Sequence, residues 1–409
     1  MTNSPHTAGL ARLEALLPPG QPVGLAAALV RIPTENPPGD EAPALEHLAA
    51  LLGDWGWRVE RVVSPQGRLN LAARLDFGRP GPWLALNGHL DVVPAGDPAA
   101  WSLPPYAGLV ADGRLHGRGA ADMKAGVAAL VWGARLIQLA GTGVTDLAGG
   151  LLLLLASDEE SGGGQGAACL VTPGPAQAAA AIIAEPTGLN LSIGARGALW
   201  ARISLRGRAA HGSRPQAGAS AIAALAPLIT RLSAWRPPAE DALLGRGTLN
   251  LGRVWGGERI NQVPASAGLE VDARFCPPDR PADLLAALAK LAEAALDGTG
   301  VTAFTEAFMT ALPYALDPAE PWLALVAECA AMVSGRTARI RGGQGFTDAR
   351  FYVERWGIPA AVLGPGSARQ IHAPDEWVDL AQIRQAALIY ALAGSRFLGP
   401  GPADGDRSA

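Results

Sequence analysis

The chain has 409 residues, more than one hydrophobic core usually supports, so we expect at least two domains. Hydrophobic residues make up 49% and charged residues 17% of the sequence, which excludes an intrinsically disordered chain. The net charge of −4 gives no electrostatic reason to expect nucleic acid or an anionic membrane as a partner.

The cysteines and the apolar runs of the sequence indicate the cellular compartment in which the protein is expected. Cys169, Cys276 and Cys329 lie far apart without a Cys-x-x-Cys pair, so we expect neither a disulfide framework nor a thiolate zinc site. This usage fits a reducing, intracellular environment. The N-terminus has no basic segment followed by an apolar one, so no signal peptide is expected. The longest aliphatic run, residues 151–156, is far shorter than a membrane span. Together these features predict a soluble, cytoplasmic protein.

The first part of the chain mixes helical and strand-like patterns. Apolar residues recur at helical spacing in residues 22–31 and 42–57, and the proline-rich segment 32–39 between them is predicted to be a loop. Strand-like runs follow, then a helix, then two short apolar runs typical of strands buried on both faces. In chain order these are strands 58–64, 69–76 and 83–87, helix 123–140, and strands 151–156 and 180–184.

The pattern changes between residues 190 and 303. Strands 191–207, 248–255, 266–276 and 300–305 surround helices 217–234 and 281–297. This β-α-β-β-α-β order is the split βαβ signature of a small α+β, ferredoxin-like domain. Alternation of helix and strand then resumes with helix 320–333, strand 359–363 and helix 380–396.

The sequence therefore predicts a small domain inserted into a larger one. We expect an α/β domain formed by residues 1–189 and 304–398, and an inserted domain spanning 190–303. The last residues, 399–409, are rich in Gly, Pro and Asp and are predicted to form a disordered tail.

One strand end carries a potential metal ligand. The apolar run 83–87 is followed by His89 and Asp91, two positions apart. In an extended segment both side chains point to the same side. Imidazole is the commonest metal ligand, and a nearby carboxylate can fix its tautomer. A strand end whose Asp caps a turn explains this motif alone equally well.

Other polar residues without an obvious structural role follow predicted strands or lie in loops. They are Asp122, Glu159, Glu160, Glu185, His211 and His372. For Asp122, directly before a predicted helix, an N-cap is the simpler role. Glu159 and Glu160 belong to three successive acids after a buried strand, which repel one another unless a cation or a shared proton relieves them. A solvated acidic turn is the alternative for these acids.

Two histidines and several carboxylates at strand ends make a mixed nitrogen and oxygen ligand set. Such a set suits Zn²⁺ or a similar metal better than Ca²⁺ or Mg²⁺. Because adjacent side chains of an extended chain point in different directions, one of Glu159 and Glu160 can bind metal while the other faces a water. A metal lowers the pKa of its water, and a general base removes the proton. These residues therefore predict metal-assisted hydrolysis.

In order and length, these motifs resemble the M20 metallopeptidase family, in its acetylornithine deacetylase and succinyl-diaminopimelate desuccinylase branch. The resemblance spans residues 22 to 396, from Arg31-Ile32-Pro33-Thr34 through the His372 motif. It implies a zinc-peptidase-like α/β/α catalytic domain with an inserted lid and dimerisation domain. It also implies two divalent metal ions as cofactors, Zn²⁺ or alternatively Co²⁺.

The resemblance implies roles for the individual residues. The two ligand sets would be His89, Asp122 and Glu185 for one metal, and Asp122, Glu160 and His372 for the other. Asp122 would bridge the metals, and the peptide bond after it is cis in that family. Glu159 would be the general base, Asp91 would orient His89, and His211 would stabilise the oxyanion from the lid.

The same resemblance implies substrate contacts from the inserted domain. Arg196, Asn261 and Arg274 match such positions, and a guanidinium can bind a substrate carboxylate through two hydrogen bonds. Surface salt bridges are the alternative role for the two arginines. The loop 342–351 departs from the desuccinylases, because it places Phe346 where they carry a substrate-binding Thr. A phenyl ring cannot hydrogen-bond a carboxylate, so a different or more apolar substrate is expected.

The predicted function is hydrolysis of the amide bond of N-acyl amino acids by a metal-dependent deacylase. A dipeptidase or a glutamate-carboxypeptidase-like exopeptidase is the alternative within the same family. A binding protein that has lost the chemistry is the alternative from another class, although this chain retains every ligand and the base. The expected partners are a small acylated amino acid or short peptide and, through the lid, a second copy of the chain.

Overall fold

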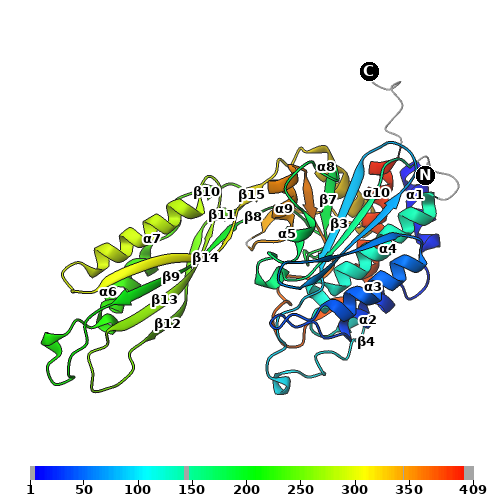
Figure 1. Cartoon of the computed structure of the whole chain (residues 1–409). Helices are drawn as coiled ribbons and strands as arrows, with labels where there is room; N and C mark the ends of the chain where they lie inside the picture. Colours follow the sequence, from blue (N-terminus) through cyan, green and yellow to red (C-terminus); the bar gives the residue numbers. More distant parts are fainter. Residues whose placement is uncertain (1–4, 142–146, 344, 400–409) are drawn as a thin grey trace. The chain divides into compact units, whose positions relative to one another are not determined.

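The computed structural model describes residues 5–141, 147–343 and 345–399 and divides the chain into two compact units (Figure 1). Unit 1 comprises Met1–Ile193, Leu316–Arg341 and Thr347–Ala409, and unit 2 comprises Gly194–Ala315 and Gly342–Phe346. Each unit contains its own sheet and core. Residues 400–409, most of the predicted tail, lie outside the described part of the chain.

Unit 1 begins with the helices α1 (Pro5–Leu16), α2 (Val23–Val30) and α3 (Ala42–Asp54). The sequence predicted α2 and α3 and the loop between them. It did not predict α1, whose Pro and Gly weaken the helical signal. Leu13 of α1 is nevertheless buried, so packing against the rest of the unit stabilises this helix.

A mixed sheet forms the centre of unit 1. Its strands are β1 (Arg58–Val63), β2 (Leu69–Asp76), β3 (Trp83–His89), β6 (Gly150–Ala156), β7 (Ala180–Ile183), β8 (Leu191–Ala195) and β17 (Ala360–Val362). They are ordered β1-β2-β6-β3-β7-β17-β8. Strand β3 is parallel to β6 and β7, and β17 is parallel to β7. The remaining pairs are antiparallel, namely β1 with β2, β2 with β6, and β8 with β17. The predicted mixed α/β fold is therefore confirmed.

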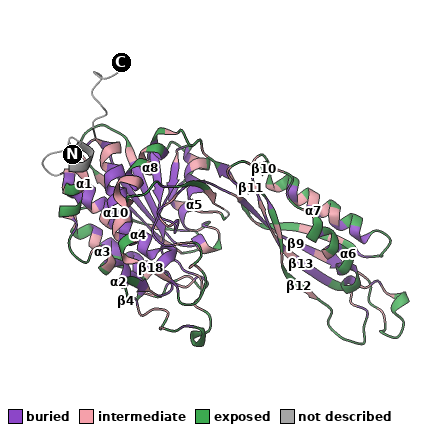
Figure 2. Ribbon diagram, turned by 180° about the vertical axis from the view of Figure 1, so that it is seen from behind, coloured by how far each residue is buried: buried purple, intermediate pink, exposed green. Residues whose placement is uncertain are grey.

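Helices cover this sheet. Helix α4 (Ala125–Gly141) and helix α10 (Leu380–Leu398) pack against each other and against β3, and α8 (Pro321–Ser334) contacts α10 and β17. The short helices α5 (Ala167–Leu170) and α9 (Ala349–Phe351) contact β6 and β17, respectively. Every residue of β6 is buried, as its continuous apolar run predicts. The strands at the centre of unit 1 are coloured as buried in Figure 2.

One described stretch, Ala120–Gly141, is long and apolar enough to span a membrane, but 78% of its apolar window is buried inside the unit. It therefore behaves as a core helix in this fold. Smaller strands complete the chain. They are β4 (Leu109–Ala111), β5 (Arg114–His116), β10 (Glu240–Asp241), β11 (Gly245–Arg246), β15 (Tyr314–Ala315), β16 (Ile340–Gly343) and β18 (Trp377–Asp379).

Unit 2 is an antiparallel sheet packed against two helices. Its main elements are β9 (Gly197–Arg206), α6 (Ala221–Ala234), β12 (Thr248–Gly256), β13 (Ser266–Phe275), α7 (Pro281–Leu296) and β14 (Thr302–Ala311). The β-α-β-β-α-β order and the spatial order β12-β13-β9-β14 are those of a ferredoxin-like fold. Leu228 and Leu288 from the helices pack with Ile203 and Leu269 from the strands in one core.

Helix α6 begins later than the sequence pattern predicted. Its first residue is Ala221 rather than residue 217, because Ser220 is the N-cap and its hydroxyl accepts a hydrogen bond from the backbone N–H of Ala223 at 3.1 Å. Residues Pro215–Ala217 form a separate 3₁₀ turn. A local cap thus fixes this boundary, whereas apolar periodicity alone does not.

Candidate metal centre

The carboxyl ends of three neighbouring parallel strands bring the predicted ligands together. His89 is the last residue of β3, Glu159 and Glu160 follow β6, and Glu185 follows β7. Strands β6, β3 and β7 lie side by side in that order. Because parallel strands end at the same edge of a sheet, residues nearly 100 positions apart in sequence converge there.

Asp122 reaches the same place from the start of α4. It lies in the turn Ala120–Lys124, where its backbone angles are not helical, and the Asp122–Met123 peptide bond is cis, as the family resemblance implies. Helix α4 approaches β7 so closely that a Cβ atom on Gly126 would collide with the carbonyl oxygen of Ala184. This close packing, which glycine permits, seats Asp122 near the ends of the strands.

The two oxygens of Asp122 face two different histidines. Oδ1 lies 3.3 Å from Nε2 of His89, and Oδ2 lies 3.4 Å from Nε2 of His372. Glu185 Oε1 lies 3.9 Å from Nε2 of His89, and Glu160 Oε2 lies 3.1 Å from Nε2 of His372. Both ligand sets inferred from the resemblance are thus assembled around the Asp122 carboxylate.

These residues fit a divalent cation. One potential ligand atom from each of His89, Asp122 and Glu160 lies within 4.8 Å of the others, and the same holds for His89, Glu159 and Glu185. Nε2 of His89 and Oδ1 of Asp122 are buried, and neither makes a hydrogen bond within the described part of the chain. Because buried polar atoms without partners are costly, a cation between them would stabilise both.

The charges at the site also favour a cation. Burial, and then repulsion by Glu185, raises the pKa of Glu159 well above its ordinary value. Burial, and then repulsion by Asp122, does the same to the pKa of Glu185 and raises that of Glu160. Without compensating positive charge, these acids hold protons instead of ionising together. A divalent metal would replace those protons.

The pKa values of the two histidines are raised as well, which favours their charged form. Burial lowers the pKa of His89, but the nearby carboxylates of Asp122 and Asp91 outweigh burial and raise it well above its ordinary value. Hydrogen bonds to Asp122 and Glu160 raise the pKa of His372 to about 10. Each imidazole therefore faces enough negative charge to hold a proton at Nε2, the atom that would otherwise bind the metal.

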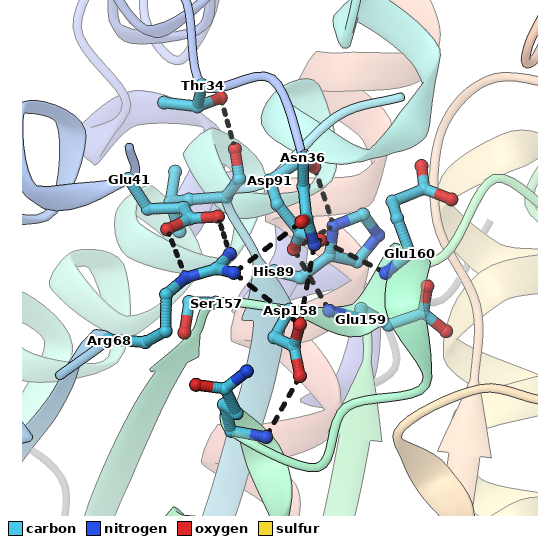
Figure 3. A network of polar contacts seen from close by, with 12 residues as sticks. Thr34, Asn36, Glu41, Arg68, His89, Asp91, Ser157, Asp158, Glu159 and Glu160 are labelled. Atoms are coloured by element: carbon cyan, nitrogen blue, oxygen red, sulfur yellow. Dashed lines mark hydrogen bonds and ion pairs between the residues drawn. The ribbon is translucent and has the colours of Figure 1, made fainter. Parts of the chain in front are cut away.

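Asp91 contacts both His89 and the turn that carries Glu159 and Glu160 (Figure 3). Its backbone carbonyl lies 2.9 Å and its Oδ1 3.3 Å from Nδ1 of His89, which places a proton on Nδ1 and leaves Nε2 for a metal. The carboxylate also accepts hydrogen bonds from the backbone N–H groups of Glu159 and Glu160, at 3.1 and 3.0 Å. Asp91 thus orients a ligand and fixes the turn carrying two functional acids.

The loop that carries His372 is tied to a distant segment. The side chain of Asp375 accepts hydrogen bonds from the backbone N–H of Ser102 at 2.7 Å and from its hydroxyl at 2.9 Å. His372 itself has a positive φ of 60°. These contacts fix the loop that presents His372 to Asp122.

Two buried charged residues support Asp122 and received no role from the sequence. Glu376 Oε1 accepts hydrogen bonds from the backbone N–H groups of Ala121 and Asp122, at 2.8 and 3.0 Å. Its Oε2 pairs with Nη1 of Arg118 at 2.6 Å. The only sequence signal for Glu376 was its place beside the His372 motif.

Asp348 is a further buried acid near the centre that the sequence did not single out. A Cβ atom on Gly163 would lie 2.7 Å from its Oδ1, so it packs directly against the loop after Glu160. Burial raises its pKa to about 7. Its negative charge, when present, also raises the pKa values of Glu159 and Glu185.

The remaining predicted site residues belong to unit 2. The backbone N–H of Ser213 donates to Nδ1 of His211 at 3.2 Å, so the neutral ring carries its proton on Nε2. The backbone carbonyl of Asn261 accepts a hydrogen bond from Gly212, the residue after His211, at 2.8 Å. The structure thus holds His211 and Asn261 on adjacent segments. Their functional roles stay predictions.

Both predicted arginine clamps make contacts within unit 2. Arg196 donates two hydrogen bonds to the carbonyl of Leu244, at 2.9 and 2.7 Å. Arg274 pairs with both carboxylate oxygens of Asp272 at 2.8 Å and lies over the ring of Phe346, 5.3 Å from its centroid. Their roles in binding substrate also stay predictions.

Comparison with known sequences gives one family. A family model described as Peptidase family M20/M25/M40 matches residues 85–395. The succinyl-diaminopimelate desuccinylase of Methylorubrum populi is 31% identical over 389 residues, which cover 92% of this chain and 98% of that protein.

Solved structures share the fold at low sequence identity. An M20 family metallo-carboxypeptidase from Sulfolobus solfataricus has a TM-score of 0.77 and 17% identity, covering 92% of this chain and 99% of that one. A dinuclear metal-binding peptidase of the M20 family from Bacillus subtilis has a TM-score of 0.69 and 18% identity, covering 96% and 99%. These likenesses show a common architecture.

Proposed function

Because the chain belongs to Peptidase family M20/M25/M40, we propose that its site binds two divalent metal ions and hydrolyses N-acyl amino acids. The protein is a metal-dependent hydrolase of the deacylase type, and the family predicted from its motifs is confirmed. The metal stoichiometry, the residue roles and the substrate are the proposed part.

One observation carries the proposal, namely the position of Asp122 between two histidines. Each of its oxygens faces a different imidazole, and Glu185 and Glu160 each lie beside one of them. This is the arrangement expected of a carboxylate that bridges two cations. The B. subtilis neighbour is described as dinuclear, which supports the same stoichiometry here.

Glu159 is the buried carboxylate that neither proposed ligand set requires. When bound, the metals would lower the pKa of water and polarise the amide carbonyl. Glu159 would take the proton of the attacking water and pass it to the leaving amine. Burial raises the pKa of Glu159 well above its ordinary value, which suits a group that must hold that proton between the two steps.

His211 would stabilise the negative charge on the carbonyl oxygen. Its Nδ1 accepts from Ser213, so the neutral ring offers an N–H donor at Nε2. A donor aimed at a developing oxyanion lowers the barrier of amide hydrolysis. Asp91 takes no part in proton transfer in this scheme and acts by positioning His89 and the Glu159 turn.

The loop around Phe346 supports a substrate with an apolar group. The ring of Phe346 makes an edge contact with Trp200, with centroids 6.4 Å apart, and lies under the guanidinium of Arg274. Aromatic faces beside a cation can receive an apolar acyl chain and an adjacent carboxylate. We therefore propose an N-acyl amino acid less polar than succinyl-diaminopimelate.

We propose Zn²⁺ as the resident metal, with Co²⁺ as an alternative, because both accept mixed imidazole and carboxylate ligands.

The three cysteines are free in the structure, which supports a reducing compartment and hence the cytoplasm. A homodimer formed through unit 2 also belongs to the proposal.

The test measures amine release from a panel of substrates by the protein loaded with Zn²⁺ or Co²⁺. The panel contains N-acetyl, N-succinyl and N-hexanoyl amino acids, succinyl-diaminopimelate and dipeptides. We expect cleavage of the acylated amino acids, fastest for the longer apolar acyl group. Faster cleavage of dipeptides would replace the deacylase assignment with an exopeptidase, and no cleavage of any member would refute the function.

A further inference from the structure

The proline-rich loop between α2 and α3 lies directly against the segment that carries His89. Thr34 donates its hydroxyl hydrogen to the carbonyl of Leu90 at 2.6 Å. The backbone N–H of Asn36 donates to the carbonyl of Val92 at 2.9 Å, and Val92 donates back to Thr34 at 3.0 Å. The loop is thus paired with the residues on either side of Asp91.

This pairing places the side-chain amide of Asn36 next to two buried carboxylates (Figure 3). Its Nδ2 donates to Oδ2 of Asp91 at 2.9 Å and lies 3.5 Å from Oδ1 of Asp158. Asp91 Oδ2 is also the atom that accepts the backbone N–H of Glu160. Asn36 therefore orients the carboxylate of Asp91. That carboxylate in turn contacts His89 and the turn that carries Glu159 and Glu160.

Arg68 determines which way this amide points. Its Nη1 lies 3.5 Å from Oδ1 of Asn36, and because a guanidinium only donates, it selects the oxygen end of the amide. The NH₂ end is left to face Asp91. With the amide reversed, an NH₂ group would face Arg68 and an oxygen would face Asp91, so both contacts would be lost.

Arg68 also provides positive charge among buried acids. It makes a two-point ion pair with Glu41 and lies 3.6 Å from Oδ1 of Asp158. Burial raises the pKa of Glu41, and the hydrogen bond from Arg68 opposes that rise. Asp158 has a positive φ of 69°, and its other oxygen accepts the backbone N–H of Gln165 at 2.9 Å. The network thus holds the start of the turn that continues into Glu159.

We propose that Asn36, oriented by Arg68, is a positioning residue of the metal centre. It holds the Asp91 carboxylate in the orientation in which Oδ1 faces His89 and both oxygens bind the backbone of residues 159 and 160. This inference rests on the proposed metal site, and extends it to two residues outside the ligand sets. Partners of this kind typically change metal affinity by about 10–100-fold.

The test compares Asn36→Leu and Arg68→Met with the wild-type protein. Leucine keeps approximately the volume of the amide but offers no donor to Asp91, and methionine keeps much of the arginine stem without its charge. Arg61→Met is the matched control, because Arg61 makes a two-point ion pair with Glu46 on the surface, where its side chain is 52% exposed. The dissociation constants for Zn²⁺ and Co²⁺ are measured by competition with a chromophoric chelator.

We expect Asn36→Leu and Arg68→Met each to weaken metal binding about 10–100-fold, and Arg61→Met to leave it unchanged. At saturating metal, kcat should fall while KM for substrate stays within about twofold, because the residues act through Asp91 and do not touch substrate. Dissociation constants for both variants within threefold of wild type would overturn the proposal.

Circular dichroism and thermal unfolding in chelator show whether each variant is folded. If Arg68→Met does not fold, Asn36→Leu together with the smaller change Asn36→Ala decides the question, with the same expected and opposing results. Metal affinity does not depend on the substrate chosen. A wild-type protein that binds metal tightly but cleaves no amide would therefore refute the proposed function and leave this inference standing.

Discussion

Oδ1 of Asp91 accepts a hydrogen bond from the backbone N–H of Glu159 at 3.1 Å. The same oxygen lies 3.3 Å from Nδ1 of His89, so one atom links a proposed metal ligand to the proposed general base. Because Asp91 is fully buried and its pKa is lowered by His89 despite burial, it stays ionised and keeps both contacts. A single carboxylate therefore positions both the proposed ligand His89 and the proposed base Glu159.

Replacing the proposed base should abolish turnover without removing metal. Glu159→Gln keeps the size of the side chain but cannot take a proton, so we expect kcat to fall by about 10²–10⁴-fold. Metal content, measured by mass spectrometry after gel filtration, should equal that of the wild type. Activity within tenfold of wild type would contradict the assignment of Glu159.

Replacing His372 should lower metal binding, whereas replacing Glu159 should lower only turnover. His372→Ala removes a proposed ligand of only one cation, so we expect it to retain about one metal of two. Affinity for the second metal ion should fall by more than the roughly 10–100-fold that is typical when a residue hydrogen-bonded to a ligand is replaced. The stoichiometry is read from titration with Co²⁺ and its visible spectrum. A variant that still binds two metals tightly would exclude His372 as a ligand.

Asp348 should make the metal-free protein less stable as pH rises. Its pKa is about 7 in the fold against an ordinary value of 3.8, so between these values the unfolded chain loses a proton that the folded chain keeps. The free energy of unfolding therefore falls as pH rises from about 4 to about 7, by up to about 4 kcal/mol for this group.

Asp348→Asn removes that titration. In chelator, the wild-type melting temperature should fall more steeply between pH 4.5 and 7.5 than that of the variant, as followed by circular dichroism. Parallel curves for the two proteins would show that Asp348 is not held protonated by the fold.

Removing one partner of the buried ion pair between Arg118 and Glu376 should lower the free energy of unfolding more than replacing both partners by apolar residues. Both side chains are at most 3% exposed, and Glu376 also binds the backbone N–H groups of Ala121 and Asp122. Glu376→Leu alone leaves the Arg118 charge buried and unpaired, so we expect a loss of about 3–5 kcal/mol in denaturant unfolding.

The double variant Arg118→Met with Glu376→Leu is the matched comparison. Because it leaves no unpaired buried charge, it should recover a substantial part of that loss. A double variant less stable than Glu376→Leu would show that Arg118 contributes through contacts other than this pair.

The sequence indicated the ligands because their positions follow from a local rule. His89, Glu160 and Glu185 each end or follow an apolar run, and parallel strands bring such ends together. The two histidines and the run of acids then indicated metal-assisted hydrolysis. The confirmed mixed α/β fold and family rest on the same ordered motifs.

The sequence could not reveal the residues behind the ligands. Asn36 contacts Asp91 across 55 positions, and Glu376 contacts Asp122 across 254. Such pairs are brought together by packing of loops whose course no local periodicity encodes. Asn36 lies within the predicted loop 32–39, and Arg68 directly precedes the predicted strand 69–76. Their roles follow from burial and from hydrogen-bond partners, which only the folded chain shows.

The most direct test of the account is the rate of amine release from an N-acyl amino acid as Zn²⁺ is added to chelator-treated protein. We predict no activity without metal, a rise with added Zn²⁺, and a plateau when two ions are bound per chain. Activity that persists fully after removal of bound metal, or a protein that binds no more than one ion at its plateau, would contradict a two-metal hydrolytic centre built around Asp122.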